Sequence, residues 1–393
     1  MSKEVFILGG KRTPMGEYVG VLKDISAIDL GAVAARGALE ATRVKPEEID
    51  HTIMGNALQT SGDAIYGARH VALKAGVPFE RPALTVNRLC GSGIQSIISG
   101  AHMLQLGEAQ SCLVGGMESM SQAPHVIRGA RSGFALGQGK LEDSLMVALL
   151  DTYCNTPMAG TAENLARKFE IAREEQDKYA LRSQQEAKRA LDAGFLAEEI
   201  VPVEVKSRKG SQLVEHDDHP RPETTLEGLA KLKPAFAKDG FVTAGNASGI
   251  VDGAAALVIA SEEFVKQRDL KPMGRIVSWA YAGVEPEIMG IGPVPASRAA
   301  LAKAGLSLND IDLVEVNEAF AAQYLAVERE LGLDRSRTNV NGGAIALGHP
   351  LGATGTRLVL TLLHELHRRN GRYGLATACI GGGQGIAMIV ERV

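Results

Sequence analysis

Aromatic residues are scarce in this sequence. Phe, Trp and Tyr together make up 4% of its 393 residues, and there is a single Trp. Glycine is in excess instead, with 45 residues, about 11% against a usual share of about 7%. Because no Gly-X-Y period runs through the chain, a collagen-like structure is excluded. The composition therefore favours close backbone packing and tight loops over an aromatic-rich binding surface.

A strong net charge, long apolar runs and paired cysteines are also missing. The net charge is −4, so we expect no nucleic-acid partner. No apolar run reaches the roughly 18 residues of a membrane span, so we expect no membrane partner. No two of the four cysteines form a CxxC pair, which argues against a metal site and a disulfide framework. With no secretory signal visible either, we expect a reducing, cytoplasmic location.

The chain repeats itself. Residues 38–50 resemble residues 300–312, an offset of 262 from 38 to 300, and the same offset pairs Gly93 with Gly355. Each copy has the pattern of an amphipathic helix, a short turn and an apolar strand. Strands that alternate with helices predict an α/β fold with a largely parallel sheet in each half.

The middle of the chain has a different composition. Residues 162–192 are charged with a helical period, which predicts a solvated helix pair, and residues 200–226 turn from strand-like to proline-rich. We therefore expect two matching halves around an insertion. The expected boundaries are an N-terminal half of residues 1–122 and 251–272, a loop domain of residues 123–250 and a C-terminal half of residues 273–393.

Cys90 is the first candidate for chemistry. An apolar strand, Ala83–Val86, leads through a short turn to Cys90, then to Gly91, Gly93 and an apolar helix. A thiol at a helix N-terminus has a lowered pKa, which predicts a nucleophile. Two alternatives stay open, a buried structural cysteine and a dinucleotide site, because GSGIQS approaches the G-x-G-x-x-G fingerprint.

Three further segments, glycine-rich or at the end of a strand, hold candidates for chemistry. His349 lies among glycines and prolines, and Cys379 precedes Gly381 and two more glycines. Asn317 and Glu318 end an apolar strand. If the two halves face each other, one thiolate could attack an acyl group while the histidine takes its proton. The other cysteine could then move a proton at carbon, with N–H groups holding the oxyanions. An ordinary loop histidine is the alternative for His349.

Six motifs, in this order along nearly the whole chain, resemble the thiolase family: NRLCGSG, GGMESMSQAP, TAGNASG, DLVEVNEAF, NVNGGAIALGHPLG and CIGGGQG. The connecting segments look closest to its mitochondrial-type 3-ketoacyl-CoA members. The resemblance implies a five-layer αβαβα core of two duplicated half-domains plus an inserted loop domain. It also implies a homodimer or homotetramer.

The same resemblance implies an acyltransferase. Its reaction is reversible Claisen condensation and thiolysis: acetyl-CoA and acyl-CoA give 3-ketoacyl-CoA and CoA through an acyl-cysteine. Short- to medium-chain substrates are expected, acetoacetyl-CoA among them. Acyl-CoA and CoA are the partners, no cofactor is needed because the coenzyme A thioesters are themselves substrates, and no metal is expected.

The resemblance also assigns roles to individual residues. Cys90 is the nucleophile, His349 activates it, and Cys379 is the acid and base at the α-carbon of the second acyl-CoA. Asn317 joins His349, through a water, in one oxyanion hole, and the N–H groups of Cys90 and Gly381 form the other. Further positions contact coenzyme A or line the acyl and pantetheine pocket, namely Arg221, Ser248, Met158, Met289 and Phe320.

Some segments depart from the family or suggest other readings. Ala172 stands where a serine often caps a helix, and residues 250–253 are IVDG where relatives often have LNDG, near the expected wall of the site. The HDDH run at residues 216–219 could suggest a metal site, but its spacing fits an exposed acidic loop better.

Two other functions are possible for a chain with this pattern, and the sequence disfavours both. A decarboxylating ketoacyl synthase is disfavoured because Cys379 replaces a second histidine, and a non-catalytic acyl-CoA-binding protein is disfavoured because all four catalytic positions are present.

Overall fold

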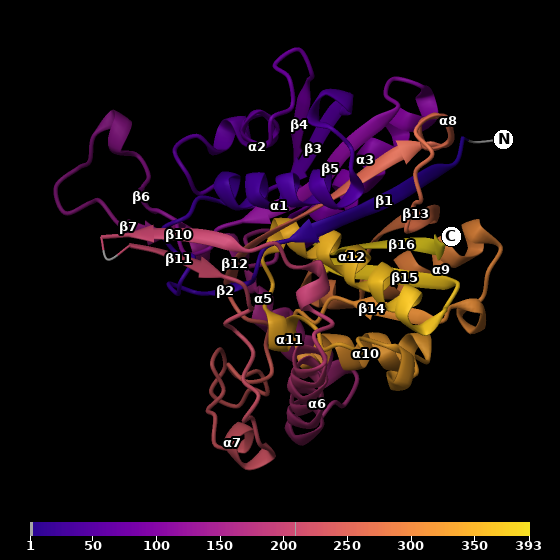
Figure 1. Ribbon diagram of the computed structural model, residues 1–393. Helices are drawn as coiled ribbons and strands as arrows, with labels where there is room; N and C mark the ends of the chain where they lie inside the picture. Colours follow the sequence, from indigo (N-terminus) through magenta and orange to yellow (C-terminus); the bar gives the residue numbers. More distant parts are fainter. Residues whose placement is uncertain (1–2, 209) are drawn as a thin grey trace.

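One continuous sheet runs through the computed structural model, which describes residues 3–208 and 210–393 (Figure 1). Its ten described strands follow the order β14-β15-β16-β13-β1-β12-β5-β3-β4, with the short β2 paired to β12. The strands of the first half are β1 (Val5–Arg12), β2 (Gly16–Glu17), β3 (His51–Gly55), β4 (Ala83–Val86), β5 (Ser111–Glu118) and β12 (Val251–Ser261). Those of the second half are β13 (Gly274–Gly283), β14 (Leu313–Val316), β15 (Tyr373–Ile380) and β16 (Gln384–Arg392).

The sheet is mixed in both halves, so the expectation of a largely parallel sheet is wrong. β3 pairs in parallel with β4 and β5, and β14 with β15. β12 runs antiparallel to β5 and β1, and β16 runs antiparallel to β15 and β13. The helical periods identified the crossover connections correctly. The antiparallel strands β12 and β16 carry no sign of their direction in the sequence.

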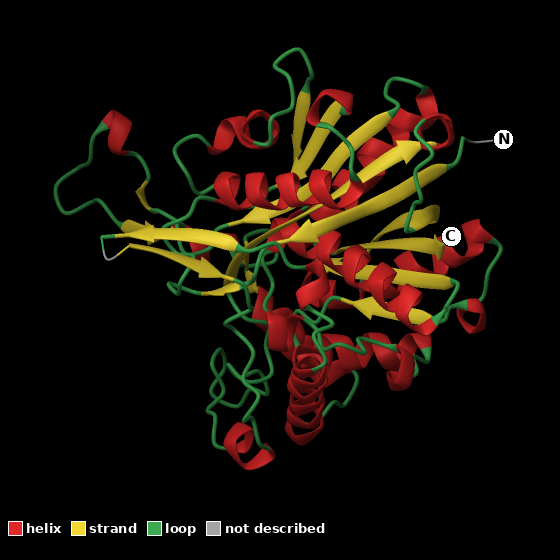
Figure 2. Cartoon of the chain, in the orientation of Figure 1, coloured by secondary structure: helices red, strands yellow, loops and turns green. Residues whose placement is uncertain are grey.

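Helices cover both faces of each half and give the five-layer αβαβα arrangement expected from the sequence (Figure 2). Packing of α3 against β3 and β5, and of α12 against β5, β12 and β15, makes these two helices the central layer. The central helices are α3 (Ser92–Leu106) and α12 (Leu351–Arg369), and the outer helices are α1 (Ala27–Thr42), α2 (Gly67–Lys74), α9 (Pro293–Ala304) and α10 (Ala321–Leu331). The α12 residues on the central side are buried along almost the whole helix.

The duplicated halves match in detail. A single 3-10 turn precedes the first parallel strand in each, at Pro46–Glu48 and at Leu308–Asp310. In both, a carboxylate three residues on accepts the N–H of the residue before the turn, from Lys45 to Glu48 at 2.9 Å and from Ser307 to Asp310 at 2.8 Å. The repeat in the sequence therefore corresponds to a repeat in local structure.

The residues between β5 and β12 form helices and short hairpins beside the core. The charged stretch forms two helices as expected, but Leu165 and Tyr179 are fully buried, so the pair is part of the core on one side. Nothing caps the second helix at Ala172 through a side chain. The elements are β6 (His125–Ile127), β7 (Leu141–Asp143), α4 (Ser144–Ala148), β8 (Leu150–Asp151), β9 (Thr156–Pro157), α5 (Met158–Lys168), α6 (Arg173–Asp192), β10 (Val203–Ser207), β11 (Gly210–Val214) and α7 (Leu226–Ala230). Two short helices lie elsewhere, α8 (Glu262–Gln267) and α11 (Ala344–Leu347).

The HDDH run is not simply an exposed acidic loop. Asp217 is buried and accepts hydrogen bonds from both terminal nitrogens of Arg12, at 2.6 and 2.9 Å. Glu199 accepts a third bond from the same guanidinium, at 2.7 Å. The run therefore anchors the loop to β1. In the part of the chain that the structure describes, no group of three or more His, Cys, Asp and Glu side chains could hold a metal ion, and no helix could cross a membrane.

Candidate active site

Cys90 lies in a tight turn between β4 and α3. Leu89, directly before it, has a left-handed backbone with φ of 46°, which is unusual for a branched side chain. The turn is held by side chains. Asn87 Oδ1 accepts the Leu89 N–H at 2.9 Å, and Ser92 Oγ donates to the Leu89 carbonyl at 2.7 Å. These contacts fix the direction in which the Cys90 thiol projects.

The environment of Cys90 corrects the expectation of a lowered pKa. Burial of the thiol, with a smaller contribution from the nearby Glu118 carboxylate, raises its pKa to about 11. The N–H groups of Gly381 and of Cys90 itself act in the opposite direction but do not prevail. Cys90 lies two residues before the first residue of α3. The loss of hydration raises the thiol pKa by more than the helix N-terminus lowers it. The thiol therefore needs a base in order to react near neutral pH.

Cys379 is the neighbour of Cys90 and is fully buried. It is the next-to-last residue of β15 and pairs with Gly385 across the sheet. Burial raises the pKa of its thiol well above the usual range, and the Cys90 sulfur adds to this shift. The structure thus brings the two predicted cysteines together from opposite halves, together with the Gly381 N–H.

His349 is a neutral base with a defined tautomer. Thr354 Oγ1 lies 2.6 Å from Nδ1 and donates its own proton to the Pro350 carbonyl at 3.1 Å. The hydroxyl must therefore accept from Nδ1–H, which leaves the lone pair on Nε2. The Asn317 Nδ2 amide donates to that Nε2 at 3.3 Å. Burial, with a smaller contribution from Arg357, lowers the His349 pKa to about 3.

Asn317 follows β14 and has an amide oxygen still free for a ligand or water. Its N–H continues the parallel ladder by donating to Thr377 O at 2.9 Å. Its Oδ1 is buried and has no hydrogen-bond partner among the described residues. A buried polar atom without a partner is costly and is common at functional sites. The Asn317 Oδ1 could therefore accept a hydrogen bond from a water molecule that also contacts the substrate.

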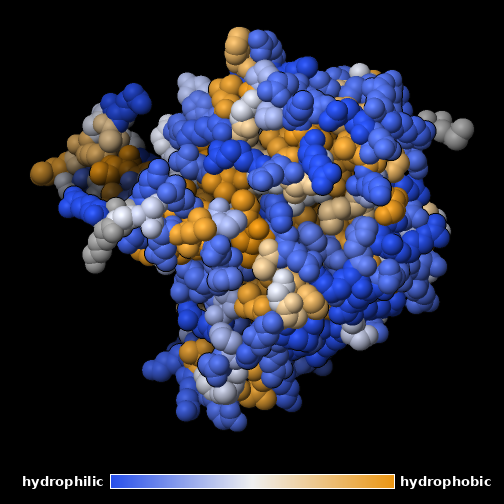
Figure 3. All heavy atoms as spheres, in the orientation of Figure 1, coloured by the Kyte–Doolittle hydropathy of each residue, from blue (hydrophilic) through white to orange (hydrophobic). Residues whose placement is uncertain are grey.

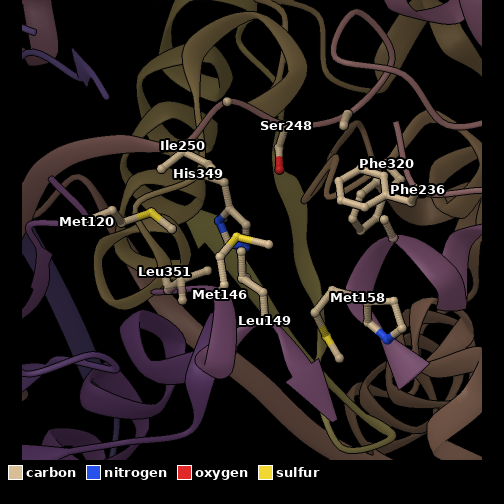
Figure 4. A pocket seen from close by; sticks show the side chains of 14 residues that line it. Met120, Met146, Leu149, Met158, Phe236, Ser248, Ile250, Phe320, His349 and Leu351 are labelled. Carbon is tan, nitrogen blue, oxygen red and sulfur yellow. The ribbon is translucent and has the colours of Figure 1, made fainter. Parts of the chain in front are cut away.

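Two cavities meet at this constellation. One of about 160 Å³ contains His349, Ser248 and Phe320 (Figure 4), and one of about 230 Å³ reaches Cys90 and Gly381. The side chains that line both are Leu149, Met158 and Leu351. The lining of the first cavity is nearly all apolar and that of the second is mostly apolar, which suits a thioester with an acyl chain.

The other predicted contact residues divide into two groups. Met289 is buried behind the cavities, in one apolar cluster with Cys379, Met158 and Phe320. Arg221 lies apart from this cluster, in a pocket of about 350 Å³, and its guanidinium pairs with Glu17. The structure therefore brings the catalytic candidates together and places Arg221 at a separate site.

Sequence reasoning missed several residues of the site. Met120, Met146, Phe236 and Leu351 line the His349 cavity, and Glu118 lies buried beside it. A signal existed for Glu118, because it ends an apolar strand within a motif already singled out. Glu318, which was predicted together with Asn317, is also buried. Ile250 also lines the cavity, as expected for the IVDG departure.

Comparisons with known proteins agree with this geometry. The family models described as thiolase, N-terminal domain and thiolase, C-terminal domain match residues 5–263 and 270–392. The chain is 60% identical over 388 residues to human mitochondrial 3-ketoacyl-CoA thiolase, covering 98% of each protein. It is 51% identical to the acetyl-CoA acetyltransferase of Pseudomonas aeruginosa, covering 99% of this chain and all of that protein.

Solved structures give the same result. The human mitochondrial enzyme in complex with CoA is 59% identical and superposes with a TM-score of 0.97, covering 100% of this chain and 98% of that one. The acetyl-CoA acetyltransferase of Bacillus anthracis is 45% identical, with a TM-score of 0.98 and coverage of 100% and 99%.

One expectation is contradicted by these relatives. A cytoplasmic location was expected, but the human, bovine and murine relatives are named as mitochondrial enzymes. Free cysteines indicate only a reducing compartment and do not distinguish one such compartment from another.

The names of the relatives, 3-ketoacyl-CoA thiolase and acetyl-CoA acetyltransferase, describe acyltransferases. Condensation and thiolysis between coenzyme A thioesters is their general reaction. With both domain models matched across the chain and the fold shared from end to end, the protein belongs to the thiolase family and is an acyltransferase that acts on coenzyme A thioesters.

Proposed function

We propose that this thiolase carries the acyl group on Cys90 and uses Cys379 as the acid and base at carbon. The convergence of Cys90, Cys379 and the Gly381 N–H beside a neutral His349 supports this proposal most directly. The division into an N-terminal half of residues 1–122 and 251–272, a loop domain of residues 123–250 and a C-terminal half of residues 273–393 is part of the proposal.

The first step forms the acyl-enzyme. His349 Nε2 takes the Cys90 proton, and the sulfur attacks the thioester carbonyl. The resulting oxyanion accepts hydrogen bonds from the N–H groups of Cys90 and Gly381. The carbon–sulfur bond to CoA then breaks, and Cys379 gives its proton to the departing sulfur. Acyl-Cys90, free CoA, a Cys379 thiolate and a His349 imidazolium remain.

The second step forms the carbon–carbon bond. The Cys379 thiolate removes a proton from the α-carbon of the second acyl-CoA, and the enolate oxygen accepts from His349 Nε2–H and from the water held by Asn317. The enolate carbon attacks the acyl-Cys90 carbonyl, and the Cys90 thiolate leaves and takes back the proton from His349. Thiolysis is the same path in reverse.

Substrate contacts follow from the cavities. Ser248, Met158, Met289 and Phe320 are proposed to contact the pantetheine and acyl parts, and Arg221 the nucleotide end of coenzyme A. The apolar lining supports short- to medium-chain substrates, acetoacetyl-CoA among them. No cofactor is required by either step, since each proton and electron pair is supplied by substrate or protein.

The protein is proposed to act as a homodimer or homotetramer. Apolar side chains are exposed on the projecting segment around β6 and β7, at Ile127, Phe134, Leu136 and Leu141. Figure 3 shows this segment as a projection on the left of the view, where orange, hydrophobic side chains lie beside blue, hydrophilic ones. Exposed apolar groups of this kind mark contact surfaces. Light scattering or sedimentation would give the number of subunits.

Transfer of a labelled acetyl group tests the proposed chemistry. Intact-mass analysis after incubation with acetyl-CoA should show one added acetyl per subunit in the wild type and none in Cys90→Ala. Acetylation of Cys90→Ala at the wild-type level would overturn the role of Cys90. Measuring kcat/KM for thiolysis from four carbons upward then defines the acyl range, since a collapse beyond four carbons would exclude medium chains.

A further inference from the structure

The loop that carries His349 is held at both ends by buried carboxylates. Glu118, the last residue of β5, accepts a hydrogen bond of 2.9 Å from the Gly352 N–H. Glu318 accepts one of 3.1 Å from the Ile345 N–H. Ile345 lies four residues before His349 and Gly352 three residues after it. Both glutamates are fully buried, and neither has a place in the proposed chemistry.

Both oxygens of Glu118 accept two hydrogen bonds each, from donors in two separate parts of the chain. Its Oε1 accepts from the Asn56 amide at 2.8 Å and from the Leu58 N–H at 3.0 Å. Its Oε2 accepts from the Ala57 N–H at 3.0 Å, in addition to Gly352. The carboxylate thus joins the loop after β3 and the end of β5, both in the first half, to the start of α12 in the second half.

Glu318 fixes the start of the His349 loop, as Glu118 fixes its end. It accepts hydrogen bonds from Tyr179 at 2.6 Å, from Ser183 at 2.7 Å and from Asn339 at 2.9 Å. The first two belong to α6, so this carboxylate ties the start of the His349 loop to the inserted helices. The adjacent residue, Asn317, is the hydrogen-bond partner of His349.

The backbones of β5 and α12 are in close contact beside Glu118. A Cβ on Gly116 would lie 1.8 Å from the Gly352 carbonyl oxygen, and one on Gly352 would lie 2.5 Å from the Met117 oxygen. The strand end and the helix start are therefore in direct backbone contact. A change in the Glu118 hydrogen bonds is transmitted over three residues to the imidazole without a flexible side chain between them.

We propose that Glu118 and Glu318 are positioning residues that hold the His349 imidazole within reach of the Cys90 thiol. This inference rests on the proposed role of His349 as the base for Cys90. Neither carboxylate touches substrate; each acts through the loop whose ends it fixes.

Alkylation of Cys90 by iodoacetamide separates this role from a purely electrostatic one. The Glu118 charge raises the Cys90 pKa, so removing the charge alone would make the thiolate form more readily and speed alkylation. Glu118→Gln also turns two of the four acceptor sites into donors, which releases part of the loop. If positioning dominates, alkylation at pH 8.5, where Glu118 with its pKa of about 7 is charged, slows instead. The two roles thus predict opposite signs.

The expected result for Glu118→Gln is slower alkylation and a kcat lower by about 10- to 100-fold, because small displacements of a catalytic group are that costly. KM for the acyl-CoA should change by no more than about two-fold, since the binding cavity is retained. Glu318→Gln should act in the same direction. Alkylation at the wild-type rate or faster in Glu118→Gln would overturn the proposal.

Glu199→Gln is the matched control. Glu199 is also a buried carboxylate and accepts from Thr361 of α12 at 2.8 Å, but it does not contact the His349 loop. The Glu199→Gln variant should have a lower Tm than the wild type, but Cys90 should be alkylated at the wild-type rate. If Glu118→Gln does not fold, Glu118→Asp replaces it: the charge stays, so electrostatics predicts no change, whereas the shorter side chain loses bonds and slows alkylation.

His349→Ala separates the proposed role of His349 from the positioning role of Glu118. If its alkylation is not slowed, the proposed role of His349 is wrong and the positioning role falls with it. If His349→Ala slows alkylation and Glu118→Gln does not, the positioning role alone is wrong.

Discussion

Gly93 and Gly355 are in direct contact where the two central helices cross. A Cβ on Gly93 would lie 2.9 Å from the Gly355 Cα and 2.4 Å from the Thr356 nitrogen. The two residues are also equivalent positions of the internal repeat, so the axis that relates the halves passes between them. Cys90 lies three residues before Gly93, and His349 six residues before Gly355. The contact therefore sets the spacing between the nucleophile and its base.

Gly93→Ala should destabilise the protein by about 3 kcal/mol, because the added methyl meets backbone that cannot move aside. Gly100→Ala, in the same helix, is the control. Its Cβ would lie 2.8 Å from the Ile259 and Val114 methyl groups, which can shift. The unfolding free energy of Gly100→Ala should fall by only about 1 kcal/mol, because the better helix propensity of alanine offsets part of the steric cost. Denaturant unfolding measures both, and equal losses would contradict the crossing argument.

The sequence allowed the repeat, the helices and the cysteine–histidine constellation to be predicted, because each leaves a local pattern. Gly93 and Gly355 were paired by the offset alone. Strand direction was not predictable, since a buried β12 has the same apolar run whether it is parallel or antiparallel. The pKa of Cys90 was predicted in the wrong direction because burial depends on segments distant in sequence. The Arg12–Asp217 pair was missed for the same reason: its partners are 205 residues apart.

Cys379→Ala should separate the two half-reactions. Without this thiol, carbon–carbon bond formation should fall by at least about 1,000-fold, since no other group is proposed to move the α-proton. Acetylation of Cys90 should persist at a reduced rate, because loss of the acid slows only the departure of CoA. Intact mass and condensation rate, measured on the same sample, test this. Full turnover by Cys379→Ala would show that the assigned role is wrong.

Arg221 and Glu17 should have opposite effects on substrate binding. Arg221→Gln removes a cation for the coenzyme A phosphates and should raise KM by about 10-fold. Glu17 pairs with the same guanidinium on the exposed surface, where such pairs contribute little to stability. Glu17→Gln should therefore lower KM slightly, by about two-fold, because a competing anion is gone. A raised KM in both variants would mean that the ion pair itself shapes the site.

Ala172→Ser should stabilise the protein by about 1 kcal/mol. Helix α6 begins at Arg173 with no side chain accepting its first free N–H groups, and a serine hydroxyl at Ala172 can accept one. Ala193→Ser, at the other end of the same helix, is the control and should change stability by less than about 0.5 kcal/mol. Tm measures both, and kcat should be unchanged in each.

The neutral state of His349 should make stability fall with acidity. Its pKa is about 3 in the folded protein against an ordinary value of 6.5, because burial disfavours the charged ring. Between these values the unfolded chain binds a proton that the folded chain does not. Its contribution to stability is therefore complete above pH 6.5 and lost as the pH falls toward 3, at up to about 1.4 kcal/mol per pH unit.

Other buried groups act in the opposite direction, which is why a difference measurement is needed. Burial raises the pKa of Glu118 to about 7 and that of Glu315 to about 8, so the folded protein binds these protons more tightly. Their contribution is present below the ordinary glutamate pKa of 4.5 and is lost as the pH rises toward 7 and 8. Both groups remain in a His349 variant.

The difference in unfolding free energy between His349→Asn and the wild type, measured by urea at pH 7, 6 and 5, isolates the histidine. It should move in favour of the variant by about 1 kcal/mol per unit as the pH falls below 6.5, since asparagine does not titrate. Asn317→Ala is the control, because it removes the Nε2 partner and keeps the buried ring, so its pH slope should match that of the wild type. A pH-independent difference for His349→Asn would mean that the imidazole has the same pKa in the folded protein as in the unfolded chain. In that case burial would not hold the ring neutral, and a growing fraction of His349 would be protonated, and so unable to take the Cys90 proton, as the pH falls below 6.5.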